Sequence, residues 1–150
     1  AVELGAYEIV PVATKRAIVK LDAKKEASKL KRWQAIAEGA AKQSGRMMIP
    51  RISEVKTFGE ALQIAKELDV NVIPYECARG MDGTREIFGS IKPGMSVGIF
   101  IGPEGGWEES EVEKAKELDV KPVTLGRRIL RTETAGLTTL SILMYLLEES

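Results

Sequence analysis

The segment Val97-Gly98-Ile99-Phe100-Ile101-Gly102-Pro103-Glu104-Gly105-Gly106 joins a continuous apolar run to a glycine-rich turn, and an acidic segment, 108–118, follows it. An apolar run such as 97–101 is typical of a central strand that is buried on both faces. Carboxylates crowd the beginning of the acidic segment, where they are favourable because they face the positive end of a helix dipole. The passage from a buried strand to a helix predicts an α/β unit built on a parallel sheet.

Repeated helix-like segments extend this pattern along the chain. The hexapeptide Ala-Lys-Glu-Leu-Asp-Val occurs at 65–70 and at 115–120, and each copy leads into a short β-branched run, Val72-Ile73 or Val123-Thr124. Helices that alternate with short buried strands predict an α/β fold, with a mostly parallel sheet flanked by helices, in one domain over 1–150. Besides 108–118, the predicted helices cover 24–44, 58–69 and 134–149.

The composition excludes several classes of site. The chain has no histidine and one cysteine, Cys77, which excludes Ser-His and Cys-His nucleophile pairs, an internal disulfide and a cysteine-based zinc site. No apolar stretch reaches the roughly 18 residues of a membrane span, and the start lacks the pattern of a signal peptide. We therefore expect a cytoplasmic protein with no membrane contact. Ala1 to Gly5 resemble the end of a helix, so we expect the natural protein to continue upstream.

The charge is unevenly distributed along the chain. Residues 1–56 hold 12 Lys/Arg against 6 Asp/Glu, whereas residues 57–150 hold 10 against 16. A basic segment within a neutral protein indicates either a phosphate-binding face or a solvated helix surface.

The glycine-rich turn at 101–106 lies where α/β sheets usually bind ligands, beyond the carboxyl end of a parallel strand. Its glycines allow a ligand to approach the backbone, and Pro103 stiffens the turn. It matches neither a P-loop nor the Gly-x-Gly-x-x-Gly fingerprint, and the acidic helix start after it would repel phosphate. The turn therefore favours a cationic or neutral cofactor over a nucleotide phosphate. The alternative is a plain structural turn.

A second unusual segment, 125–135, reads Leu-Gly-Arg-Arg-Ile-Leu-Arg-Thr-Glu-Thr-Ala and precedes the last predicted helix. Its charges surround Ile129 and Leu130, which we expect an apolar group to cover. Thr132 or Thr134 could cap the final helix. Because this loop faces the same sheet edge as 101–106, we expect the two loops to form one site.

The two segments together resemble the paired signature of the SPOUT-class ribosomal RNA small-subunit methyltransferase E family. The resemblance spans nearly the whole chain. Further similar positions are Glu3-Leu4-Gly5, Lys15-Arg16, Arg32-Trp33, Gln43-Ser44-Gly45-Arg46 and Pro50. Two departures are small, since Trp107 stands where Phe is common in the family and Gly136 stands where Ala is common.

The resemblance implies a fold whose C-terminal segment threads through a loop to form a deep trefoil knot. It also implies an upstream RNA-binding barrel that this chain lacks. The implied activity is transfer of a methyl group from S-adenosylmethionine to N3 of a uridine in small-subunit ribosomal RNA. The alternative is a non-catalytic module of the same fold that binds RNA or a nucleotide. A dinucleotide oxidoreductase is disfavoured because the glycine fingerprint is missing.

The resemblance also implies roles for individual residues. Without histidine, the candidates for the base that accepts the N3 proton are Glu133 and Glu104, and Arg131 is the candidate for stabilising the uridine anion; a salt bridge between Arg131 and Glu133 is the alternative. The residues expected to hold the cofactor, with Ile129 and Leu130 over the adenine, are Tyr75, Glu76, Ile101, Gly102, Pro103, Gly105, Leu125, Gly126, Ile129, Leu130, Thr132 and Ala135. Those expected to contact ribosomal RNA or the small subunit are Lys15, Arg16, Arg32, Gln43 and Arg46. Arg32, Gln43 and Arg46 have the spacing of one helix face.

The last predicted helix carries more apolar residues than one sheet face can cover, which indicates contact with another chain. The family resemblance independently implies a homodimer, in which the basic helix of one chain approaches the cofactor of the other. No metal is expected in the reaction.

Overall fold

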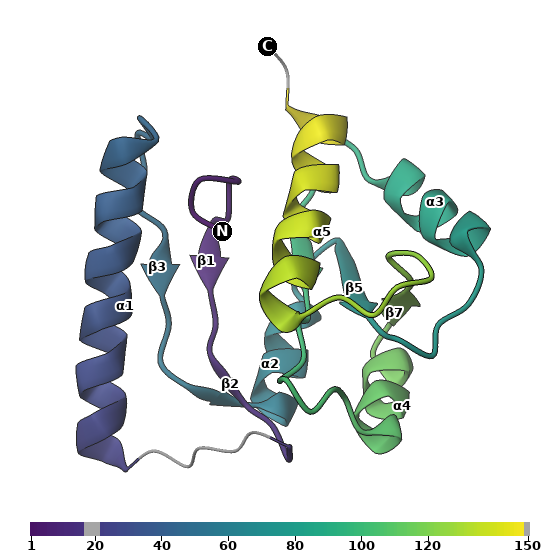
Figure 1. Cartoon of the computed structure of the whole chain (residues 1–150), viewed down its shortest axis with the longest axis horizontal. Helices are drawn as coiled ribbons and strands as arrows, with labels where there is room; N and C mark the ends of the chain where they lie inside the picture. Colours follow the sequence, from purple (N-terminus) through teal and green to yellow (C-terminus); the bar gives the residue numbers. More distant parts are fainter. Residues whose placement is uncertain (17–21, 149–150) are drawn as a thin grey trace.

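The structure is a computed structural model that describes residues 1–16 and 22–148, and Figure 1 shows the arrangement of its helices and strands. In this described part, α/β architecture is confirmed, with helices around short parallel strands. The elements in chain order are β1 (Glu8–Ile9), β2 (Val12–Ala13), α1 (Ala23–Gln43), β3 (Arg51–Ile52), β4 (Lys56–Thr57), α2 (Phe58–Ala65), β5 (Val70–Pro74), α3 (Met81–Ser90), β6 (Val97–Ile99), α4 (Glu109–Glu117), β7 (Val120–Val123) and α5 (Thr132–Leu147).

A three-stranded sheet in the order β6-β5-β7 lies at the centre of the second half. Both neighbours pair with β5 in parallel, with Val72 opposite Ile99 on one side and opposite Lys121 on the other. All three strands therefore end at the same edge of the sheet, where the loops that follow them meet.

The sheet has a hydrophobic core cluster on each face, because successive side chains of a strand point to opposite faces. Ile73 packs with residues of α2 and α4, including Leu62 and Val112. Val72 packs on the other face with residues of α3 and α5, including Phe88 and Leu143. Helices thus cover both faces of the sheet. β6 was expected to be a central strand, but it is a half-buried edge strand, and the central strand is β5. Asn71 of β5 and Lys121 of β7 interrupt the apolar runs of the other two strands.

The first half forms a smaller parallel ladder beside α1. β1 pairs with β3 and β2 pairs with β4, and Ser53 N continues the ladder by donating to Ile9 O at 2.9 Å. Ala37 and Ala41 of α1 are buried against Ile9 and Ile52. Figure 1 shows α1 at one side of the molecule and α3 and α4 at the other, with α5 between them.

The predicted helices are confirmed, but several of their ends differ from the prediction. α1 runs over Ala23–Gln43 because the Asp22 side chain accepts from Lys25 N and starts the helix. α2 already ends at Ala65, and α5 already begins at Thr132. The helix α3 was not predicted, since only Thr84 and Phe88 of its ten residues are buried. Within the described residues, no helix is long and apolar enough to cross a membrane.

Candidate cofactor cleft

A cleft of about 570 Å³ lies at the edge of the sheet where β5, β6 and β7 end. Its walls come from three separate stretches of chain: 74–76 after β5, 101–107 after β6, and the loop 124–131 after β7 together with Thr132, Glu133 and Ala135 in the first turn of α5. The parallel pairing of the strands is what brings these three loops together. This arrangement is the ligand position expected of an open parallel sheet.

All of the residues that the sequence singled out for cofactor binding and catalysis line this one cleft. They meet from segments up to 60 positions apart, between Tyr75 and Ala135. The lining residues that the sequence did not single out are Pro74, Gly106, Trp107, Thr124, Arg127 and Arg128. Arg127, Arg128 and Arg131 lie within five residues of one another. This clustering of arginines could have identified Arg127 and Arg128 as candidate site residues from the sequence.

Trp107 packs against the glycine-rich turn 101–106, the glycine loop. Its side chain is 7% exposed and packs at 5.3 Å, centroid to centroid, against the ring of Phe58. A Cβ on Gly102 would lie 3.0 Å from the indole Nε1 and 3.1 Å from Cε2. Gly102 is therefore required for packing of the indole, whereas the sequence had suggested close approach of a ligand as the reason for this glycine.

The other two glycines of the predicted site also have structural reasons. Gly105 lies against Arg16, because a Cβ there would be 3.3 Å from the Cβ of Arg16. Gly126 has φ +118°, a backbone conformation that side chains disfavour, and no atom lies within 4 Å of its would-be Cβ. Gly105 therefore packs on protein, and Gly126 is needed to turn the chain.

Threonine hydroxyls fix the beginning of the loop 124–131. Thr124 N donates to Thr84 Oγ1 of α3 at 3.0 Å. The Thr124 hydroxyl in turn donates to Gly126 O at 3.1 Å. Farther along, Leu130 is half-buried, but Ile129 is 81% exposed. Within the described part of the chain, the protein itself therefore leaves the Ile129 side chain uncovered.

The charged candidates Glu104, Arg131 and Glu133 all lie on the cleft wall with exposed side chains. Among the described residues, none of the three takes part in an ion pair within 4 Å, so the alternative of an Arg131–Glu133 salt bridge is not supported. Arg131 is the N-cap residue of α5 and makes no side-chain capping bond, which also removes Thr132 and Thr134 from that position. Within the described residues, no group of three potential metal ligands occurs.

The Tyr75 phenol lies on the same wall, next to the free and exposed Cys77. A hydrogen bond with Cys77 raises the pKa of Tyr75, and burial and the charges of Cys77, Glu109 and Glu76 raise it further. The phenol therefore stays protonated at neutral pH and serves as a donor or acceptor of hydrogen bonds, not as a base.

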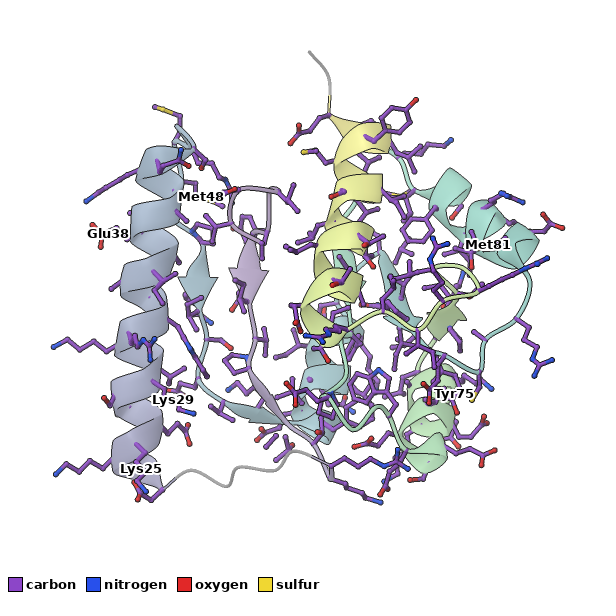
Figure 2. The ribbon with its side chains drawn as sticks, viewed as in Figure 1. Lys25, Lys29, Glu38, Met48, Tyr75 and Met81 are labelled. Carbon is purple, nitrogen blue, oxygen red and sulfur yellow. The ribbon has the colours of Figure 1, made fainter. Side chains whose placement is uncertain are left out.

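The predicted RNA contacts do not form one surface. Lys15 and Arg16 lie beside Glu108, with Lys15 Nζ 3.3 Å from Glu108 Oε2. Arg32 and Gln43 are exposed on α1. Lys25 and Lys29 of the same helix lie at the opposite side of the molecule from Tyr75 (Figure 2).

Arg46 does not belong to the helix face that the spacing suggested. α1 ends at Gln43, and Gly45, with φ +72°, turns the chain before Arg46. The Arg46 guanidinium instead donates to Val2 O at 3.0 Å and to Ala6 O at 2.7 Å. It ties the first residues of the chain to the end of α1.

Known proteins that are similar to this chain are RNA methyltransferases. A family model described as an RNA methyltransferase domain matches residues 1–144. The ribosomal RNA small subunit methyltransferase E of Bacillus subtilis is 43% identical over 146 residues, which are 95% of this chain and 57% of that protein. Its counterpart in Mesomycoplasma hyopneumoniae is 38% identical, over 94% of this chain and 59% of that protein. The chain thus spans little more than half the length of these relatives.

Solved structures of similar chains carry a cofactor. A putative methyltransferase from Legionella pneumophila, in complex with bound SAM, is 31% identical with a TM-score of 0.83, over 96% of this chain and 57% of that one. A ribosomal RNA small subunit methyltransferase E from Neisseria gonorrhoeae, bound to S-adenosylmethionine, is 35% identical with a TM-score of 0.81, over 97% and 57%.

Proposed function

This chain belongs to the RNA methyltransferase domain family, and on that premise we propose that it methylates N3 of a uridine in small-subunit ribosomal RNA, with S-adenosylmethionine as the methyl donor. The observation that carries the proposal is the convergence of both sequence signatures on one cleft. Relatives named ribosomal RNA small subunit methyltransferase E support the substrate class. The sequence resemblance to that family is confirmed by the same comparisons.

The cleft fits S-adenosylmethionine in size and charge. Its volume of about 570 Å³ lies within the range of small-molecule sites. Its wall carries the carboxylates of Glu76, Glu104 and Glu133, which favour a cationic sulfonium, and the guanidinium groups of Arg127, Arg128 and Arg131, which suit the carboxylate of the same cofactor. Ile129 and Leu130 supply an apolar surface, which is exposed at Ile129 and suits a flat adenine ring. The bound cofactor supplies an activated methyl group, and that is why we propose a reaction without a metal.

Residues of the chain would hold the uridine, accept its N3 proton and stabilise the resulting anion. N3 could accept the methyl group only after losing its proton, and Glu133 or Glu104 would accept that proton. Arg131 would stabilise the negative charge that develops on the uridine. Holding both reactants in line contributes up to about 7–11 kcal/mol to the acceleration of such a reaction. Neither carboxylate is paired within the described residues, so both are available for this role.

The test measures methyl transfer from labelled S-adenosylmethionine to deproteinised ribosomal RNA and to whole small subunits. The proposal requires label at N3 of a uridine in at least one of the two. Glu133→Gln should reduce kcat at least tenfold, a larger loss than the weakening of cofactor binding that removal of one wall carboxylate causes. Glu104→Gln is the matched variant: whichever of the two substitutions causes the larger loss of kcat identifies the base. Tight cofactor binding without any transfer to either RNA would instead favour a non-catalytic binding module.

We place the RNA on the exposed basic residues of α1, including Arg32, together with Gln43. Arg46 is engaged with backbone carbonyls, and Lys15 and Arg16 lie near Glu108, so α1 is the stronger candidate surface. Arg32→Ala should weaken RNA binding and reduce its salt dependence, because fewer counterions are released. The Kd for S-adenosylmethionine should not change. If the dependence of RNA affinity on salt concentration did not change, Arg32 would not bind RNA phosphate and this surface would be an ordinary solvated helix face.

We further propose a homodimer formed through α5. Leu137, Tyr145 and Leu146 are exposed at 43%, 86% and 46%, and with neighbouring residues they line an apolar groove on this helix. In one chain Lys25 and Lys29 of α1 lie on the opposite side from Tyr75 of the cleft wall (Figure 2), so a second copy offers a way to bring a basic helix to each cleft. The reaction would then take place in composite sites, in the cytoplasm where ribosomal RNA is made.

The family resemblance also leads us to propose the trefoil knot. In support, Gly136 at the start of α5 lies against the glycine loop, since a Cβ there would be 3.6 Å from Ile101 Cγ1. α5 also buries Thr139 and Leu143 completely or nearly so. If the chain is pulled by its two ends, a tightened knot should leave the unfolded chain shorter than the ~3.3–3.6 Å per residue of a free chain.

A further inference from the structure

Arg16 touches the tip of the glycine loop from a segment 89 positions earlier in the sequence. Its Nη1 donates to Gly105 O at 2.9 Å, and its Nε lies 3.9 Å from Glu108 Oε1. The stem of the same side chain packs on the loop, because a Cβ on Gly105 would lie 3.3 Å from Arg16 Cβ and 3.7 Å from Cδ. Both the guanidinium and the aliphatic stem therefore contact Gly105.

The backbone beside Arg16 is itself anchored to the start of α4. Lys15 N lies 3.4 Å from Glu111 Oε1, and the other carboxylate oxygen of Glu111 accepts from Glu108 N at 2.9 Å. Glu111 is only 3% exposed, so these bonds are shielded from water. The glycine loop is thus held from two sides, by Trp107 under Gly102 and by Arg16 over Gly105.

We propose that Arg16 is a positioning residue of the cofactor site: it holds the Gly105 carbonyl so that the loop 101–106 keeps the shape that receives S-adenosylmethionine. This inference rests on the proposed function and adds a residue that lies outside the cleft lining. It also changes the role predicted for Arg16 from the sequence, because a guanidinium that donates to Gly105 is less free to bind RNA phosphate.

The loop itself gives a test that does not require the cofactor. Hydrogen exchange of the Gly106 amide, which donates to Pro103 O at 2.8 Å, reports whether the loop keeps its shape. Arg16→Ala should exchange faster than the unaltered chain at the amides of 102 and 104–107, while amides of β5 keep their rates. Arg51→Ala is the matched control, since Arg51 is also an exposed arginine with an acidic partner, Glu8, but lies away from the loop.

The second measurement is calorimetry with S-adenosylmethionine. Arg16→Ala should bind it about three- to tenfold more weakly, the range expected for loss of a charge-assisted hydrogen bond that is partly open to solvent. Arg16→Lys should recover part of the affinity, because an ammonium can still donate to one carbonyl. KM for the cofactor should rise while kcat at saturation stays within about twofold, as expected for a lost binding contribution.

The outcomes are separable. Equal loop exchange in Arg16→Ala and the unaltered chain overturns the positioning role, as does a reduced salt slope for RNA binding with cofactor affinity unchanged. If the unaltered chain does not bind S-adenosylmethionine, the proposed function fails, and the exchange measurement still decides whether Arg16 holds the loop.

Discussion

The missing side chain of Gly102 shows how a single residue shapes the cleft. We predict that Gly102→Ala forces the Trp107 indole to move, because the added Cβ would lie 3.0 Å from Nε1. The unfolding free energy should fall by about 1–3 kcal/mol, the cost of overpacking a filled site. In a Trp33→Phe background, the emission of Trp107 should also shift as its burial changes. Calorimetry should show loss of cofactor binding, and unchanged emission and affinity together would contradict the packing role.

Asp69 gives a pH dependence at the same scale. It joins the beginnings of β5 and β6, since its Oδ2 accepts from Ser96 N at 2.7 Å and from Ser96 Oγ at 2.8 Å. These bonds lower the pKa of Asp69 from its ordinary value of 3.8, the backbone bond contributing most. The folded protein therefore holds this proton less tightly than the unfolded chain. The resulting stability is present above pH 3.8 and is lost as the pH falls through the folded pKa.

Asp69→Asn removes this titration, and we predict that the unfolding free energy of the variant then falls less steeply with acid than that of the unaltered chain. Urea titrations from about pH 5 to about pH 2 measure the difference. Identical slopes for the two proteins would show that the Ser96 contacts do not persist in solution.

The sequence predicted which residues meet at the cleft better than it predicted why they are there. The carboxyl ends of parallel strands share an edge, so a motif after each strand was enough to bring Gly102, Gly105 and Glu133 together. The reasons for the glycines depend on neighbours far along the chain, Trp107 and Arg16, and no local pattern contains them. Arg46 was misassigned because a spacing rule was carried past the end of its helix.

At the scale of secondary structure, the contact between β5 and β6 depends on Gly98. A Cβ there would clash with Asn71 Oδ1, and Asn71 Nδ2 donates to Ala65 O at 2.7 Å near the end of α2. We predict that Gly98→Ala costs at least about 2 kcal/mol of unfolding free energy, because a buried amide must move and lose its partner.

A double-mutant cycle checks that explanation. Gly98→Ala combined with Asn71→Ala should cost less than the sum of the single changes, since the second change removes the clash. Gly39→Ala in α1 is the control, because no atom of the described residues lies within 4 Å of its would-be Cβ, and it should stabilise the helix by up to about 1 kcal/mol. Additive costs in the cycle would rule out the clash as the cause.

The elements that the sequence missed are those with little periodic signal. α3 contains Gly83 and Gly89 and buries only Thr84 and Phe88, so tertiary contacts with the sheet stabilise it more than its own pattern does. The strands β1 to β4 have two residues each, which is too short for an alternation to be visible.

For the whole molecule, we predict that the apolar groove on α5 is buried between two copies of the chain. Leu146→Asp should give a monomer in light scattering, whereas the unaltered chain should be a dimer at micromolar concentration. Leu147 is unsuitable for the same change, because it packs on the core cluster of Val72 and Leu143 and a charge there would unfold the protein. The control is therefore a thermal melt of Leu146→Asp, which should remain cooperative. A monomeric unaltered chain would refute the dimer.

The parallel pairing of every described strand also determines how quickly this molecule can reach its native state. A parallel pair needs a long crossover, so no hairpin can form early and serve as a local nucleus. Chains dominated by such distant pairings fold more slowly than helical bundles of the same length. Of the three segments that form the cleft wall, 124–135 is also the last to be synthesised on the ribosome. A newly made chain would therefore acquire cofactor affinity only at the end of its folding, and stopped-flow refolding should show that binding lags behind the formation of helix.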